Sequence, residues 1–198
     1  VGVAGVRPLG VVMTVHFVIM GVCGCGKTTA ACVLQAHFQC PYAEGDDFHT
    51  QENRDKMGAG IPLTDEDRYP WLRNLRDWMT AQAKQGAAVS VVTCSALKRQ
   101  YRDILREATG EVIFIHLAPP QAVNLERMLA RQGHYMKADM LDSQLAILEE
   151  LQADERGVRI DNAGDAQAVQ ADMLAWIQAH VAVSAGNSRF SARMASRG

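Results

Sequence analysis

Short apolar runs alternate with helical periods along most of the chain. Apolar and β-branched runs predict buried strands at 15–20, 42–45, 89–93, 111–117 and 158–161. Apolar residues at helical spacing predict helices at 27–39, 96–108, 120–131, 138–151 and 166–182, and a long helix with Pro70 in its first turn. This alternation predicts an α/β fold of three layers, in which a central parallel sheet of about five strands lies between helices.

Length and composition favour one folded domain over 13–183. The chain has 198 residues, of which 48% are hydrophobic and 21% are charged, as in ordinary globular proteins. Residues 1–12 are expected to be an extension and residues 184–198 a disordered tail. No apolar run reaches the roughly 20 residues that span a bilayer, so we expect no membrane association.

Charge and cysteine content narrow the classes of partner. The net charge of −2 provides no overall field for nucleic acid or an anionic membrane, so any bound anion needs a local site. Five cysteines, an odd number, argue against a disulfide framework and for reduced thiols in the cytoplasm.

The clearest chemical signal is a phosphate-binding loop between the first strand and the first helix. Its glycines allow a tight curl, so that backbone N–H groups and the positive end of the helix converge on a polyphosphate. Lys27 then reaches the β- and γ-phosphates, and the Thr28 hydroxyl can bind Mg²⁺. The predicted ATP-binding residues here are Gly21, Val22, Cys23, Gly24, Cys25, Gly26, Lys27, Thr28 and Thr29.

The cysteines have a structural interpretation. A metal site at Cys23 and Cys25 would need a second Cys or His pair at ligand spacing, and none stands nearby, so both are expected to be small loop residues. A helix N-terminus can lower a thiol pKa, which would make them sensitive to oxidation. Cys32, Cys40 and Cys94 are expected to be buried apolar groups.

Acidic residues follow the short second strand, at the edge where open α/β sheets bind ligands. Asp46 can accept a proton from an attacking hydroxyl or hold Mg²⁺, whereas Asp47 is expected to point to the opposite side. A helix cap or turn is the alternative role for each aspartate. His49 can orient a substrate hydroxyl or make a structural hydrogen bond.

Blocks of residues from Val15 to Glu150 together resemble the gluconokinase family. The phosphate loop alone is common to many ATPases and GTPases, but the later blocks are specific. The matching residues are 21–28, 44–49, Asn53, 56–57, 62–65, 67–68, 70–72, 94–99, 101–103, 105–106, Arg131 and 133–134. The sequence departs from the family's usual pattern at Cys23, Cys25 and Thr28, where serine is common, and at Thr50, where proline is usual.

The resemblance implies a nucleoside-monophosphate-kinase-like fold. It also implies transfer of the γ-phosphoryl group of ATP, assisted by Mg²⁺, to the terminal hydroxyl of D-gluconate in gluconate catabolism. Lys27, Asp46 and Arg131 are the expected catalytic residues, and Thr28 and Asp46 the expected metal ligands. A homodimer is common in that family.

The substrate carboxylate calls for a planar cation. Arg68 is the first candidate and Lys98 the second, although Arg68 could instead pair with Asp65 or Asp67. Arg102 and Arg106 are expected to form solvated pairs with Asp103 or Glu107. Trp71 and Trp78 are expected in the core rather than as a platform for a sugar.

A substrate-binding region at about 46–85 and a lid at about 127–141 complete the expected organisation. Arg127 would bind ATP, and Arg131 and His134 would close over the phosphates and the substrate, which excludes water. The alternative is that these cations only complement helix ends.

Three functions remain open at this level. The first is a gluconate-type kinase. The second is a shikimate- or nucleotide-type kinase on the same scaffold, and the third is a non-catalytic nucleotide-binding regulator.

Overall fold

The computed structural model describes residues 13–130 and 137–182. Within them, five parallel strands form one sheet in the order β2-β3-β1-β4-β5, which confirms the predicted parallel sheet. The expected extension 1–12 and the whole of the expected tail 184–198 lie outside the described residues. The strands are β1 (Val15–Met20), β2 (Tyr42–Glu44), β3 (Val89–Thr93), β4 (Glu111–Leu117) and β5 (Gly157–Ile160).

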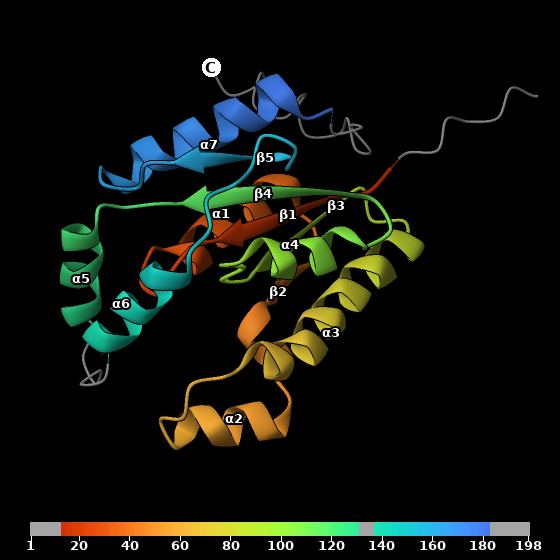
Figure 1. The fold of residues 1–198 in the computed structure, drawn as a ribbon. Helices are drawn as coiled ribbons and strands as arrows, with labels where there is room; N and C mark the ends of the chain where they lie inside the picture. Colours follow the sequence, from red (N-terminus) through yellow and green to blue (C-terminus); the bar gives the residue numbers. More distant parts are fainter. Residues whose placement is uncertain (1–12, 131–136, 183–198) are drawn as a thin grey trace, which may run out of the picture.

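Helices connect the strands and cover both faces of the sheet (Figure 1). Most of them match the predicted periods, although several ends differ by a few residues. The elements are α1 (Lys27–Phe38), the 3-10 helix η1 (Gly45–Phe48), α2 (Gln51–Gly58), α3 (Asp65–Lys84), α4 (Arg99–Arg106), α5 (Gln121–Leu129), α6 (Lys137–Ile147) and α7 (Ala166–His180).

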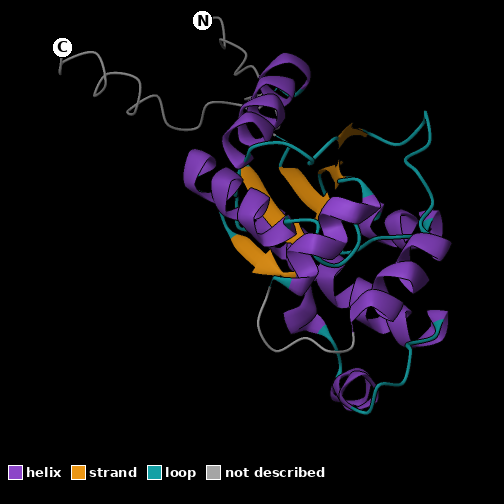
Figure 2. Ribbon diagram, turned by 90° about the vertical axis from the view of Figure 1, so that its left-hand side faces the viewer, coloured by secondary structure: helices purple, strands orange, loops and turns teal. Residues whose placement is uncertain are grey.

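The core consists of two apolar clusters, one on each face of the sheet. Alternate side chains of a strand point to opposite faces, so Phe17 and Ile19 belong to one cluster, and Val18 and Met20 to the other. Residues of α1 and α7 complete the first cluster, and residues of α3 and α4 the second. Figure 2, turned to face the carboxyl ends of the strands, shows helices on both sides of the sheet. This confirms the expected three layers.

The register brings three connections to one edge. Ile19 of β1 pairs with Thr93 of β3 and with Ile115 of β4, so these strands end almost level. The phosphate loop, the segment after β3 and the segment after β4 therefore leave the sheet side by side. Candidate ligand-binding residues gather at this edge.

Helix α3 begins earlier than the sequence pattern predicted. The Thr64 side chain accepts a hydrogen bond from the Asp67 backbone N–H, while the Asp67 carboxylate accepts one from the Thr64 N–H. This reciprocal cap starts the helix at Asp65. Pro70 is consequently in the second turn, and the prediction that it lies in the first turn was wrong.

The region after β2 also differs from the prediction. The strand ends at Glu44, and Asp46 and Asp47 lie in η1 rather than at a strand end. Helix α2 was not predicted, because Asn53 is the only buried residue in it and it lacks an apolar period. Thr50 caps α2 by accepting a hydrogen bond from the Asn53 N–H, which gives this loop a fixed start without proline.

Arg102 corrects a further expectation. Its side chain is fully buried instead of forming a solvated pair, and it makes an ion pair with Glu155, which is also buried. Its remaining N–H groups donate to backbone carbonyls, including those of Ala96 and Glu149. Arg106 does form an exposed pair with Asp103, as predicted.

Candidate active site

The phosphate loop joins β1 to α1 and has the shape that its glycines permit. Gly24 and Gly26 have φ angles of 79° and 95°, which L residues rarely adopt. The Lys27 ammonium donates hydrogen bonds to the carbonyls of Gly21 and Val22, at 3.0 Å each. Lys27 is thus held over the hollow of the loop, where an anion would meet it.

Two helices from later in the chain, α5 and α6, contact the phosphate loop. The Cys23 N–H donates to Oε1 of Gln144 in α6 at 2.7 Å, and Nδ2 of Asn124 in α5 donates to the Cys23 carbonyl at 2.9 Å. The Cys23 Sγ lies 3.6 Å from the Met128 Sδ. The loop and the helices that border the proposed lid therefore share direct contacts.

The environments of the cysteines correct part of the sequence interpretation. Cys25 is buried, and burial raises the pKa of its thiol, so the expected lowering of its pKa is wrong for this residue. Its carbonyl accepts a hydrogen bond from Asn162 Nδ2 at 2.5 Å. Cys94 is buried as expected, Cys40 is half-buried, and Cys32 is exposed because it lies on the outer side of α1.

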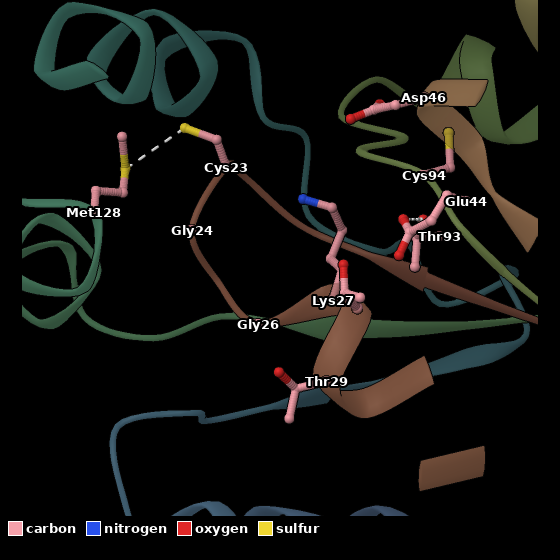
Figure 3. Close-up of a pocket in the computed structure, with 11 residues that line it drawn as sticks. Cys23, Gly24, Gly26, Lys27, Thr29, Glu44, Asp46, Thr93, Cys94 and Met128 are labelled. Atoms are coloured by element: carbon pink, nitrogen blue, oxygen red, sulfur yellow. Dashed lines mark hydrogen bonds between the residues drawn. The ribbon is translucent and has the colours of Figure 1, made fainter. Parts of the chain in front are cut away.

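A cavity of about 300 Å³ opens between the loop and the ends of β2 and β3. Figure 3 shows the Lys27 ammonium extending into it, with loop residues on one side and Glu44 and Asp46 on the other. Polar groups from three separate segments thus surround one space. The lining residues are Cys23, Gly24, Gly26, Lys27, Thr28, Thr29, Glu44, Asp46, Thr93, Cys94 and Met128.

Glu44 is a site residue that the sequence analysis did not select. Its carboxylate accepts hydrogen bonds from the hydroxyls of Thr93 and Tyr42. Burial opposes its ionisation, but these bonds, a bond from Thr28 and the charge of Lys27 together lower its pKa. An ionised carboxylate therefore stands beside the Thr28 hydroxyl. The available signal was an acidic residue within the strand predicted at 42–45, near the edge where ligands bind.

Asp46 lines the cavity, whereas Asp47 is not among its lining residues. The Asp46 side chain is 93% exposed, and its Oδ1 lies 4.0 Å from His49 Nε2. The Asp47 carbonyl accepts a hydrogen bond from Arg54 at 2.8 Å. The two aspartates therefore differ in whether they line the cavity, and both lie in the turn of η1 and not in a strand.

His49 is fixed between an aromatic ring and an amide. Its ring stacks on Trp71, with centroids 4.2 Å apart, and its Nδ1 lies 3.3 Å from Nδ2 of Asn53. Burial lowers its pKa, which favours the neutral ring. Trp71 is itself buried and donates from Nε1 to the Gly45 carbonyl at 2.6 Å, so it belongs to the core as predicted.

The two candidates for binding a carboxylate lie together at the start of α3 and α4. Lys98 Nζ lies 2.9 and 2.8 Å from the two oxygens of Asp65, and Arg68 Nη1 lies 3.6 Å from Asp65 Oδ1. Arg68 therefore makes the ion pair that was its alternative role. Because both cations remain partly exposed, they are accessible to a ligand.

A second cavity, of about 360 Å³, lies on the other side of the loop. It shares Gly24, Gly26 and Thr29 with the first cavity, so the two meet at the loop. Arg127 from α5 borders it. Its other lining residues are Ala30, Ala130, Asn162, Ala166, Val169, Gln170 and Met173.

Two predicted site residues lie outside the described part of the chain. Arg131 and His134 fall in 131–136, so the structure does not place them.

Among residues 13–130 and 137–182, no group of three or more His, Cys, Asp and Glu side chains could form a protein-only metal site. The helices in these ranges are too short or too polar to cross a bilayer.

Comparisons with known proteins identify the family of this chain. No family model matches the chain. It is 45% identical over 146 residues to the thermosensitive gluconokinase of Escherichia coli K12, covering 73% of this chain and 78% of that protein. It is 41% identical over 162 residues to the gluconokinase of Gluconobacter oxydans 621H, covering 82% and 90%.

A solved structure supports the same relationship. The unliganded crystal structure of a sugar kinase from Janibacter sp. HTCC2649 is 48% identical and superposes with a TM-score of 0.79, over 86% of this chain and 98% of that one. Sequence and structure therefore agree with the features of the phosphate loop and its neighbours. This chain belongs to the gluconokinase family.

Proposed function

We propose that this protein transfers the γ-phosphoryl group of ATP to the terminal hydroxyl of D-gluconate, giving 6-phospho-D-gluconate and ADP. The observation that carries the proposal is a cavity in which Lys27 of a phosphate loop faces Asp46, in a chain of the gluconokinase family. Phosphoryl transfer depends mainly on positioning and on stabilising charge, and both needs are met by groups around this cavity.

ATP would lie along the loop with its base in the second cavity. The loop N–H groups and Lys27 would bind the phosphates, and Arg127 would contact the nucleotide from α5. The junction of the two cavities at Gly24 and Gly26 supports this placement, because one extended molecule can then reach both. Arg131 and His134 would belong to the lid that closes over them.

The donor set fits a magnesium ion bound together with the phosphates. Thr28 supplies a hydroxyl and Glu44 an ionised carboxylate beside it, with Asp46 bordering the same cavity. Oxygen ligands of this kind suit Mg²⁺, which also keeps waters and phosphate oxygens in its shell. When bound, the ion would neutralise charge on the β- and γ-phosphates.

Asp46 would act on the acceptor hydroxyl. As the hydroxyl oxygen forms its bond to the γ-phosphorus, Asp46 takes the hydroxyl proton, and the bond between that phosphorus and the oxygen of ADP breaks. His49, held by Trp71 and Asn53, would orient the same hydroxyl. At the other end of the acceptor, Arg68 and Lys98 would bind the carboxylate.

A coupled assay of ADP release tests this function. We expect turnover with D-gluconate and much less with shikimate or nucleoside monophosphates. Lys27→Ala, if it melts like the wild type, should lose at least about 10²-fold in turnover. Turnover with shikimate or a nucleotide alone would favour the other kinases, and nucleotide binding without any turnover would favour a regulator.

A further inference from the structure

Asp65, the first residue of α3, is surrounded by donors from two helices. Lys98 contacts both of its oxygens, at 2.9 and 2.8 Å, and Arg68 lies 3.6 Å from Oδ1. The Tyr101 hydroxyl donates to Oδ1 at 2.5 Å, and Gln100 Nε2 donates to Oδ2 at 2.8 Å. Asp65 thus fixes the positions of both cations that face the proposed carboxylate end of the substrate.

Tyr101 confines the cations to one place. The Arg68 guanidinium carbon and the Lys98 Nζ lie 5.7 and 5.6 Å from the centroid of its ring. The side chains of Arg68, Lys98 and Asp65 are 23%, 24% and 28% exposed, so a ligand can approach all three. The cluster is therefore held in place by several contacts, carries charge and is open to solvent.

The formal charge of this cluster is small despite its two cations. Arg68 and Lys98 contribute two positive charges and Asp65 one negative charge, which leaves one positive charge. The cluster also acts electrostatically on His49, the residue beside the proposed base Asp46. The charge of Arg68, together with burial, lowers the pKa of His49, whose ring lies 4.0 Å from Asp46.

We propose that Asp65 determines substrate specificity by cancelling one of the two cations, so that the site accepts a single negative charge at this end of the acceptor. A neutral polyol would leave the remaining cation desolvated and unpaired. A dianionic group would place an extra negative charge against Asp65. This inference rests on the proposed function, because it assumes that the substrate carboxylate lies at Arg68 and Lys98.

Three acceptors with the same free terminal hydroxyl test the proposal. They are D-sorbitol, which is neutral, D-gluconate, with one charge, and D-sorbitol 1-phosphate, with about two charges near neutral pH. Asp65→Asn keeps the shape of the side chain and removes its charge. We expect the ratio of kcat/KM for sorbitol 1-phosphate to that for gluconate to rise at least about tenfold.

Matched variants separate charge from structure. Asp67→Asn changes the same charge in the same helical turn, where Asp67 pairs with Lys56 at 2.6 Å, and should leave the ratio unchanged. The double variant Asp65→Asn/Lys98→Gln has the net charge of the wild type and should again prefer gluconate. It also tests the proposal if the single Asp65 variant does not fold.

The outcomes distinguish the two proposals. Wild-type protein that fails to phosphorylate gluconate overturns the proposed function. The specificity role alone is overturned if the wild type is active but Asp65→Asn lowers kcat/KM for all acceptors in equal proportion. Reappearance of the gluconate preference in the double variant supports it.

Discussion

Arg102 donates from Nε and Nη2 to the two carboxylate oxygens of Glu155, at 2.6 and 2.8 Å, and neither side chain is exposed to solvent. The same guanidinium holds carbonyls on both sides of this pair, at Ala96 and Leu97 and at Glu149 and Glu150. A single buried residue therefore joins the segment after β3 to the segment before β5.

Removing the charge of Glu155 should destabilise the fold strongly. Glu155→Gln leaves the Arg102 charge buried without a counter-ion, which costs about 3–5 kcal/mol. The free energy of unfolding from urea titration measures this loss. Arg106→Ala, which breaks an exposed pair with Asp103, should cost less than about 1 kcal/mol. Similar losses in the two variants would contradict the structural role of Arg102.

Asp46→Asn should depress catalysis and leave ATP binding nearly intact. The variant keeps the shape of the side chain but cannot accept the hydroxyl proton, so kcat should fall by about 10²- to 10⁴-fold. Steady-state kinetics and nucleotide titration measure the two effects separately. Asp47→Asn is the control and should be mild. A crippled Asp47→Asn with a normal Asp46→Asn would show that the assignment is wrong by one residue.

Glu44→Gln should raise the magnesium concentration that the enzyme needs. The carboxylate is ionised beside Thr28 and lines the same cavity as the loop, and an amide is a weaker ligand. We expect the half-saturating Mg²⁺ concentration to rise about tenfold, a change of about 1.4 kcal/mol in binding. Activity measured against Mg²⁺ at saturating ATP tests this. An unchanged magnesium curve would remove Glu44 from the metal site.

Gly45→Ala should displace Asp46 without touching it. A Cβ at Gly45 would overlap the carbonyl oxygen of Thr93, so η1 would have to move away from β3. A shift of about 1 Å in a reacting group can cost about 10²-fold in rate. Gly58→Ala is the matched control, because a Cβ there meets nothing within 4 Å. Equal kinetics in both variants would show that the contact at Gly45 does not position Asp46.

Stability should fall as the pH is lowered below about 6.5, and His16 should account for part of the fall. His16 is fully buried between Ser90 and the Thr109 carbonyl, and burial lowers its pKa. Below the pKa of His16 in the unfolded chain, the unfolded state binds a proton at His16 but the folded state does not, which favours unfolding. The contribution of neutral His16 to the free energy of unfolding is therefore complete above the pKa of the unfolded chain. It is lost as the pH falls towards the lower pKa of the folded protein.

Urea titrations at pH 7.5 and pH 5 measure this dependence. His16→Gln should show a smaller difference between the two pH values than the wild type, whereas His37→Gln, at an exposed position, should not. An unchanged difference in His16→Gln would assign the pH dependence to other groups. The buried His49 and His116, whose pKa values burial also lowers, would then be the next to test.

The sequence predicted those parts of the site that depend on contiguous residues. The loop around Lys27 follows from a short motif next to an apolar strand, whose periodicity is strong. Asp46 was expected near this edge, although the 3-10 turn that carries it was not. Glu44 was missed because a sequence does not reveal where a three-residue strand ends. Helix α2 was missed because it buries almost nothing and is stabilised by its cap at Thr50.

The role of Arg102 could not be predicted for a different reason. Its ion-pair partner is 53 positions away, and the local spacing to Asp103 and Glu107 favours ordinary exposed pairs. Only the return of the chain after α6 brings Glu155 to it. Contacts of this kind depend on the assembled fold, not on local pattern.

The buried ion pair also bears on how the segment from Ala118 to Leu148 can vary. That segment departs where the Ala118 N–H bonds to the Ile160 carbonyl, and it returns where the Glu149 N–H bonds to the Leu97 carbonyl beside Arg102. Both junctions are tied to the sheet independently of what lies between them. Exchange with the corresponding segment of a relative should therefore leave the sheet in place, provided that the incoming segment keeps the contacts that Asn124, Met128 and Gln144 make with the phosphate loop. Between its two junctions, the segment is constrained mainly by the loop that it supports.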